Sequence, residues 1–197
     1  MSRASRAEAS EHRSQVVTAA ARLLRDRGSA AMSIPEVMAA AGLTHGGFYK
    51  QFASKEELTG LAADAAFGEL LALLARVSAD SADAPQARAR FLGEYLTAAH
   101  RDDPGNGCPN TGLASDAARV PAGSLLRSAY TAGVSKTVEA LAETEGRPGR
   151  GKDETRSRAI FDLAAMVGAL TLARATAGDP LSDEILRVVH EALTAKP

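Results

Sequence analysis

The stretch from Ser33 to Leu58, SIPEVMAAAGLTHGGFYKQFASKEEL, constrains the fold more than any other part of this sequence. Ser33 and Glu36 stand at capping-box spacing, a hydroxyl followed three positions later by a carboxylate, which predicts the start of a short helix. Gly42 predicts the end of that helix, because glycine takes the left-handed conformation at little cost. A second, very short helix is expected over residues 44–50.

Ser54 and Glu57 repeat the capping-box spacing and open a long helix that should run to about Ser78. Two short helices joined by a tight turn that contains glycine are typical of a helix-turn-helix. The second helix of that motif enters the major groove of DNA. The sequence therefore predicts an element that reads DNA in its N-terminal part.

The residues around this motif resemble the TetR family of transcriptional regulators. The matching features are the helical run from Val16 to Arg27 (VVTAAARLLRDR), Gly28, the segment from Ser33 to Thr44, and Tyr49, Phe52, Lys55 and Leu58 at the spacing this family shows. The resemblance implies an all-α fold in two parts. These are an N-terminal three-helix helix-turn-helix domain, placed at residues 11–58, and a C-terminal six-helix ligand-binding and dimerisation domain, placed at residues 59–197.

The composition also favours an all-α, soluble protein. Hydrophobic residues are 45% and charged residues 24% of the 197, as in ordinary globular proteins, and no segment alternates with the period of a strand. The single cysteine excludes an intramolecular disulfide and favours a reducing compartment. The N-terminus is polar, and no apolar run approaches the ~18 residues of a membrane span. We therefore expect a cytoplasmic protein with no membrane partner.

The charge distribution permits DNA binding without predicting it. The net charge is −1. Residues 1–60 carry eight Lys and Arg against six Asp and Glu, and the remainder carries fifteen against eighteen. This asymmetry is mild, so the interpretation depends on the motif rather than on a basic surface.

Gly46 and Gly47 are unusual in a recognition helix, because each glycine costs about 1 kcal/mol relative to alanine inside a helix. One interpretation is a short helix held only by the packing of Phe48. The interpretation we favour is close approach, in which no side chain keeps the backbone away from the groove.

Eight residues are candidate DNA contacts. Side chains at the helix N-terminus are expected to reach base edges or phosphates, and the glycines to allow close approach. The aromatic hydroxyl and Lys55 are expected to bind phosphate, and Lys50 to bind phosphate or guanine. These residues are Ser33, Thr44, His45, Gly46, Gly47, Tyr49, Lys50 and Lys55. Residues 1–10 are expected to form a mobile arm before a first helix over about 11–27.

The middle of the chain is the expected place for an effector. The candidate pocket residues are Phe67, Phe91, Tyr95, Cys108, Leu113 and Tyr130, which are also the expected core. Cys108 precedes Pro109 and should lie at a helix N-terminus, where the dipole favours a thiolate. Two interpretations remain open: a sensor of oxidants or electrophiles, as in some members of the family it resembles, or a small apolar residue in a tight turn.

The last two helices are expected over about 153–176 and 182–195. Both are apolar on more than one face, so one face needs a partner. A second copy of the chain would supply it through a four-helix interface, and a helix-turn-helix needs such a dimer to reach two half-sites of a palindromic operator. The basic stretch 146–152 is expected to be a solvated loop.

These patterns predict a DNA-binding transcriptional regulator. We expect a repressor that an unidentified small molecule or reactive species releases from its operator. The alternatives are a helical protein-interaction module without sequence-specific DNA binding, and an activator of the same fold. No nucleophile elbow, HExxH or phosphate loop is present, so we expect no enzyme, cofactor or metal site.

Overall fold

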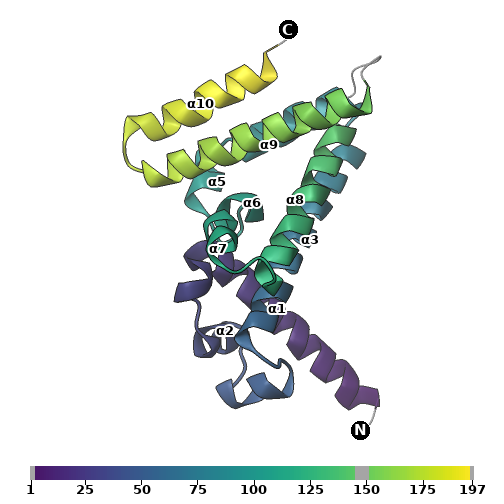
Figure 1. The fold of residues 1–197 in the computed structure, drawn as a ribbon, viewed down its shortest axis with the longest axis vertical. Helices are drawn as coiled ribbons and strands as arrows, with labels where there is room; N and C mark the ends of the chain where they lie inside the picture. Colours follow the sequence, from purple (N-terminus) through teal and green to yellow (C-terminus); the bar gives the residue numbers. More distant parts are fainter. Residues whose placement is uncertain (1–2, 145–150, 196–197) are drawn as a thin grey trace. The chain divides into compact units, whose positions relative to one another are not determined.

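A computed structural model describes residues 3–144 and 151–195, with side chains from residue 7 onward, and those residues form helices and no strand. The all-α prediction is therefore confirmed (Figure 1). The elements are α1 (Arg3–Ala31), α2 (Ile34–Ala40), the 3₁₀-helix η1 (His45–Lys50), α3 (Lys55–Ala79), α4 (Ala84–Tyr95), α5 (Ala98–Asp102), α6 (Pro109–Gly112), α7 (Ala114–Arg119), α8 (Leu125–Glu143), α9 (Lys152–Ala175) and α10 (Pro180–Thr194).

Contacts within the chain define two compact units, each built from two segments. Unit 1 contains Met1–Gly68 and Cys108–Gly133, and unit 2 contains Glu69–Gly107 and Val134–Pro197. The predicted boundary at residue 58 divides the chain by function, and that division stays a prediction.

The capping and turn residues of unit 1 have the expected conformations. The Ser33 and Glu36 side chains form a reciprocal capping box at the start of α2. Gly28 and Gly42 have φ values of 77° and 71°, so each ends a helical run in the left-handed conformation that glycine favours. The buried side chains around the motif then form one core: Val16, Ala20, Leu24, Val37, Met38, Phe48 and Leu58.

Several helix boundaries differ from the expected ones. Helix α1 begins at Arg3, so most of the expected arm is helical. The helical run that includes Pro85 is interrupted before α5, because Leu96 leaves the helical conformation and Thr97 caps α5 by accepting the His100 N–H. Residues 109–119 likewise form two short helices. The expected loop at 146–152 lies almost wholly outside the described residues.

Unit 2 is organised around α9 and α10, which lie side by side (Figure 1). Asp162 of α9 is 4% exposed and receives two guanidinium N–H groups of Arg88 from α4. Arg158 approaches the other carboxylate oxygen at 2.9 Å. Arg88 also donates to the Leu193 carbonyl of α10 at 2.9 Å. One buried carboxylate thus ties three helices, and removing Arg88 would leave it with Arg158 as its one charged partner among those named here.

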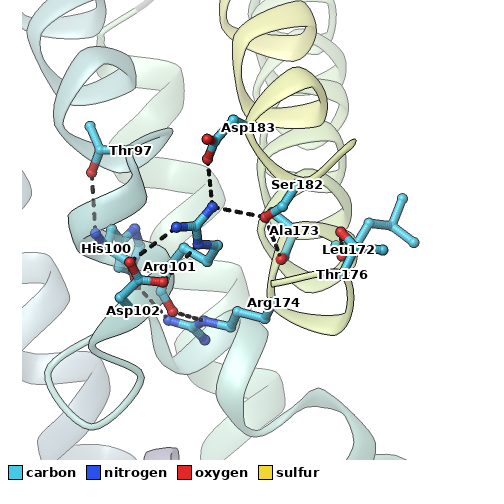
Figure 2. Close-up of polar contacts among 10 residues, drawn as sticks. All are labelled: Thr97, His100, Arg101, Asp102, Leu172, Ala173, Arg174, Thr176, Ser182 and Asp183. Carbon is cyan, nitrogen blue, oxygen red and sulfur yellow. Dashed lines mark hydrogen bonds and ion pairs between the residues drawn. The ribbon is translucent and has the colours of Figure 1, made fainter. Parts of the chain in front are cut away.

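A second polar cluster attaches α5 to the corner between α9 and α10 (Figure 2). Arg101 donates to Asp183 at 2.6 Å and to the Ser182 hydroxyl at 2.9 Å. Arg174 donates to the carbonyls of His100 and Arg101, and the Ser182 hydroxyl donates to Ala173. Hydrogen bonds to Asp102 first, and then to Asp183, hold the pKa of Arg101 above its ordinary value. The cluster satisfies the carbonyls at the C-terminal end of α5.

Helix α3 is the one described helix with the length and apolar composition that would let it cross a membrane. Half of its most apolar window is buried within the protein. Core helices of soluble proteins pass the same test, so this is weak support for a span.

Candidate DNA-binding surface

The residues from Thr44 to Lys50 form a short exposed strip on unit 1. Thr44 is extended and precedes η1, whose first bond runs from the Gly47 N–H to the Thr44 carbonyl. The Thr44 hydroxyl makes no capping bond. Thr44, His45, Gly46, Tyr49 and Lys50 are all exposed. Six of the eight candidate DNA contacts therefore share this one segment, which is a 3₁₀-helix rather than an α-helix.

Phe48 anchors the strip to the core. Its side chain is fully buried and stacks on Phe52 with ring centroids 5.4 Å apart. Tyr49 meets the Phe48 ring edge-on yet remains 69% exposed, so its hydroxyl end is held on the surface by a packed neighbour. The aromatic spacing thus places the Phe48 ring in the core and the Tyr49 ring on the surface.

The two glycines of the strip are not required by the fold. Neither has a positive φ. A Cβ at Gly46 would meet nothing within 4 Å, and one at Gly47 would lie 3.6 Å from the Met38 Cε atom, an ordinary contact. Because alanine would fit in the isolated chain, packing does not explain the glycines.

Ser33 takes part in its own capping box. Its hydroxyl donates to Glu36 Oε2 at 2.6 Å, and its N–H donates to the same oxygen at 3.1 Å. The hydrogen bond from the Ser33 side chain is the first cause that lowers the pKa of Glu36, and the one from its backbone is the second. Ser33 therefore acts in capping, and its contact with phosphate stays a prediction.

Lys55 lies apart from the exposed strip. Its ammonium donates to the Ser29 carbonyl at 2.8 Å, and the side chain is half-buried. The bond joins the first residue of α3 to the end of α1. The phosphate contact of Lys55 stays a prediction. A phosphate would have to share the Lys55 ammonium with the Ser29 carbonyl.

Arg13 of α1 is a residue that the sequence interpretation missed. Its guanidinium donates to the Gln51 carbonyl, pairs with Glu57 at 2.8 Å, and lies 4.4 Å from the centre of the Phe52 ring. The Arg13 hydrogen bond is the first cause that lowers the pKa of Glu57, followed by the Ala53 N–H. Arg13 therefore fixes the C-terminal end of the strip against α1 and α3. The one sequence signal for Arg13 is its spacing of three residues from the apolar Val16, which places both on one side of α1.

The structure distributes the six candidate effector residues over both units. Unit 1 holds Phe67, Cys108, Leu113 and Tyr130, and unit 2 holds Phe91 and Tyr95. Phe67 meets Tyr130 edge-on at 5.7 Å, and Phe91 and Tyr95 lie 5.8 Å apart. The Tyr130 hydroxyl donates to the Asn110 carbonyl, and burial followed by the neighbouring Cys108 raises the pKa of Tyr130. Their role as a pocket stays a prediction.

Cys108 occupies the N-cap position of α6, as expected from Pro109. The thiol is 3% exposed, and the Asn110 side-chain amide donates to its sulfur at 3.4 Å. Over the described parts of the chain, no three His, Cys, Asp or Glu side chains lie close enough to hold a metal ion.

Unit 2 exposes an apolar surface along its last two helices. The large exposed side chains are Ile160, Phe161 and Leu172 on α9 and Leu181 and Val188 on α10, each 47–58% exposed. On α10, Leu181, Ile185, Val188 and Ala192 recur at intervals of four, three and four residues, which forms a stripe on one face of a helix. We call these residues of α9 and α10 the apolar stripe.

The family and structural comparisons agree with this geometry. Residues 16–60 match the model of the family described as "Bacterial regulatory proteins, tetR family". A TetR transcriptional regulator from Chloroflexus aurantiacus is 27% identical, over 95% of this chain and 94% of that one, with a TM-score of 0.74. No curated protein matches the sequence significantly.

Two further solved structures share the fold at lower identity. The reduced form of Escherichia coli NemR is 19% identical with a TM-score of 0.77, over 92% of this chain and 95% of that one. Bacillus subtilis FadR, in complex with stearoyl-CoA, is 14% identical with a TM-score of 0.65, over 92% and 97%.

The matched segment is a TetR-type helix-turn-helix, and the chain has the fold of TetR-family transcription regulators. The predicted all-α fold class is confirmed, and the N-terminal segment matches the family that the sequence was expected to resemble.

Proposed function

We propose that this protein is a homodimeric transcriptional repressor that binds a palindromic operator. The observation that carries the proposal is the strip from Thr44 to Lys50, where two glycines without a structural role stand beside an exposed tyrosine and lysine. A groove-inserted backbone accounts for all of these features. Operator binding would place the protein in the cytoplasm.

The apolar stripe supports dimerisation through about residues 153–195. Exposed apolar side chains at helical spacing on α9 and α10 match a four-helix interface formed by two copies. Two copies would present two recognition helices to half-sites one or more helical turns apart. The face opposite the stripe is already used inside unit 2, where Leu186 and Leu193 are buried.

The effector is proposed only as a class. One solved relative is described in a reduced form and another with stearoyl-CoA, so both a redox-active species and an acyl ligand are candidates for this chain. A ligand shifts a repressor only by its different affinity for the operator-bound and released shapes. The candidate pocket residues named above are the first positions to test.

The sensor hypothesis for Cys108 has a direct test. The buried thiol would react slowly with bulky electrophiles in this conformation, because attack requires an accessible thiolate. Cys108→Ser should abolish release of operator by peroxide or by N-ethylmaleimide while leaving operator affinity unchanged. A Cys108→Ser protein that still responds fully would assign Cys108 to packing alone.

Selection of bound fragments from random DNA tests the function itself. The proposal predicts an inverted repeat with a high ratio of specific to nonspecific affinity. An interaction module without sequence-specific binding would enrich no motif. Transcription from a promoter that carries the selected site would then separate a repressor from an activator. We expect no turnover of substrates, since the matched family consists of regulatory proteins.

A further inference from the structure

Unit 1 contains a cleft of about 580 Å³ that the proposed function does not use. It lies where the end of α1 and the start of α3 meet the α7–α8 connection. Ser29, Lys55 and Glu56 contribute polar groups, and Val120, Pro121 and Leu126 contribute an apolar wall. Its volume falls in the range of small-molecule sites, which combine apolar walls with a few polar groups.

Lys55 brings a positive charge into this cleft with no carboxylate paired to it among the described residues. Its one hydrogen bond goes to the neutral Ser29 carbonyl at 2.8 Å. An ammonium has three N–H donors, so two remain for a ligand. Glu56 stands in the same cleft, and one of its oxygens accepts the Leu125 N–H at 3.4 Å. Its negative charge disfavours a ligand with two charges.

We propose that this cleft binds a small amphipathic monoanion and that its occupancy weakens operator binding. The carboxylate of the ligand lies on the Lys55 ammonium, and its apolar body lies on Val120, Pro121 and Leu126. The statement about binding stands alone. The statement about the operator rests on the function proposed above.

The link to the DNA reader passes through Ser29. The Ser29 N–H donates to Asp116 of α7 at 2.7 Å, while its carbonyl accepts the Lys55 ammonium. A ligand carboxylate that binds the other two N–H groups draws the ammonium toward itself and weakens its bond to that carbonyl. Because Lys55 is the first residue of α3 and lies five positions after the end of the strip at Lys50, the weakened bond changes how the reader is anchored to α1. By linkage, operator weakens ligand binding by the same factor.

The test uses 2-naphthoate, a fluorescent monoanion, and its neutral analogue 2-naphthamide. Fluorescence titration of the full chain without DNA should show saturable binding of 2-naphthoate that is about tenfold or more tighter than that of the amide. Lys55→Gln should weaken 2-naphthoate binding by about tenfold and leave the amide unchanged. Val120→Phe, which fills the cleft without touching the charge, should weaken both. Lys136→Gln, at an exposed position of α8, is the matched control and should change neither.

Three outcomes would overturn the proposal: no saturable binding of 2-naphthoate, equal binding to the Lys55→Gln protein, or equal binding to the Val120→Phe protein. Operator affinity of the unliganded protein is measured separately. A protein that binds 2-naphthoate as predicted but selects no DNA sequence would contradict the proposed function and leave the ligand site standing. A protein that binds operator equally with and without saturating 2-naphthoate would contradict the regulatory half of the proposal.

Discussion

The strip from Thr44 to Lys50 and the apolar stripe of α9 and α10 are both surfaces that the folding of a single chain does not explain. The first exposes polar side chains and contains two glycines that could be alanine without steric cost. The second exposes five large apolar side chains that would be buried in a typical helical domain. The first suits a hydrated, charged groove and the second suits another copy of the chain. We therefore propose different partners for these two surfaces.

The largest expected effect comes from breaking the apolar stripe. Val188→Glu places a carboxylate in the proposed interface and should convert the dimer to a monomer in analytical ultracentrifugation. Operator affinity should fall by about a hundredfold or more, because a monomer loses the avidity of two half-sites. Arg187→Glu on a neighbouring face of α10 is the control and should remain dimeric. A dimeric Val188→Glu protein would remove the stripe from the interface.

Gly46→Ala and Gly47→Ala test the other surface. Each added methyl group fits in the free protein, so thermal stability should be unchanged or slightly higher. Operator affinity should nevertheless fall by about tenfold or more, comparable to losing one specific contact. Retained operator affinity in both variants would show that the backbone does not approach the groove closely.

The sequence was sufficient for the helix-turn-helix because its signals are local. The Ser33 capping box, the Ser54 hydroxyl that accepts the Glu57 N–H, and the left-handed Gly42 act within a few residues, and all three have their predicted roles. The cleft at Lys55 could not be predicted, because it joins side chains from α3 to a loop more than sixty positions later. The same limit applies to Arg13, whose partners are 38 and 44 positions away.

Arg13 should behave as a positioning residue. Arg13→Ala should weaken operator binding severalfold, while the dependence of affinity on salt stays unchanged, because no phosphate contact is lost. The loss of stability should be small, as for partly exposed ion pairs. Arg13→Lys, which keeps the charge near Glu57, should recover part of the affinity. A lower salt slope in Arg13→Ala would instead make Arg13 a phosphate contact.

Lys50→Gln sharpens the contrast with Arg13. As an exposed lysine at the end of the strip, Lys50 should contact phosphate, so its removal should lower the slope of log affinity against log salt by about one. The fold should be unaffected. Operator titrations at several salt concentrations, from about 50 to about 300 mM, measure the slope of log affinity against log salt for Lys50→Gln and Arg13→Ala in parallel.

The smallest expected effect is a difference in acid sensitivity between the units. Burial is the first cause that lowers the pKa of His100 in unit 2 below its ordinary 6.5. An unfolded chain then binds a proton that the folded one does not, so unit 2 loses stability as pH falls from 6.5 toward the lowered folded pKa. Glu36 and Glu57 of unit 1 have lowered pKa values and lose their contribution only as pH falls below 4.5. Between pH 7 and pH 5.5, hydrogen exchange should therefore show a larger increase in opening for unit 2 than for unit 1. His100→Gln should remove the difference between the units.

The central proposal is that two chains form a symmetric dimer and that each chain places residues 44–50 in one half-site of the operator. The most direct measurement is a combined determination of stoichiometry and affinity on the selected operator and on a scrambled duplex of equal length, at one stated salt concentration. Chains should bind the operator in pairs, with affinity about a thousandfold or more above that for the scrambled duplex. Binding of single chains, or equal affinity for the two duplexes, would contradict it.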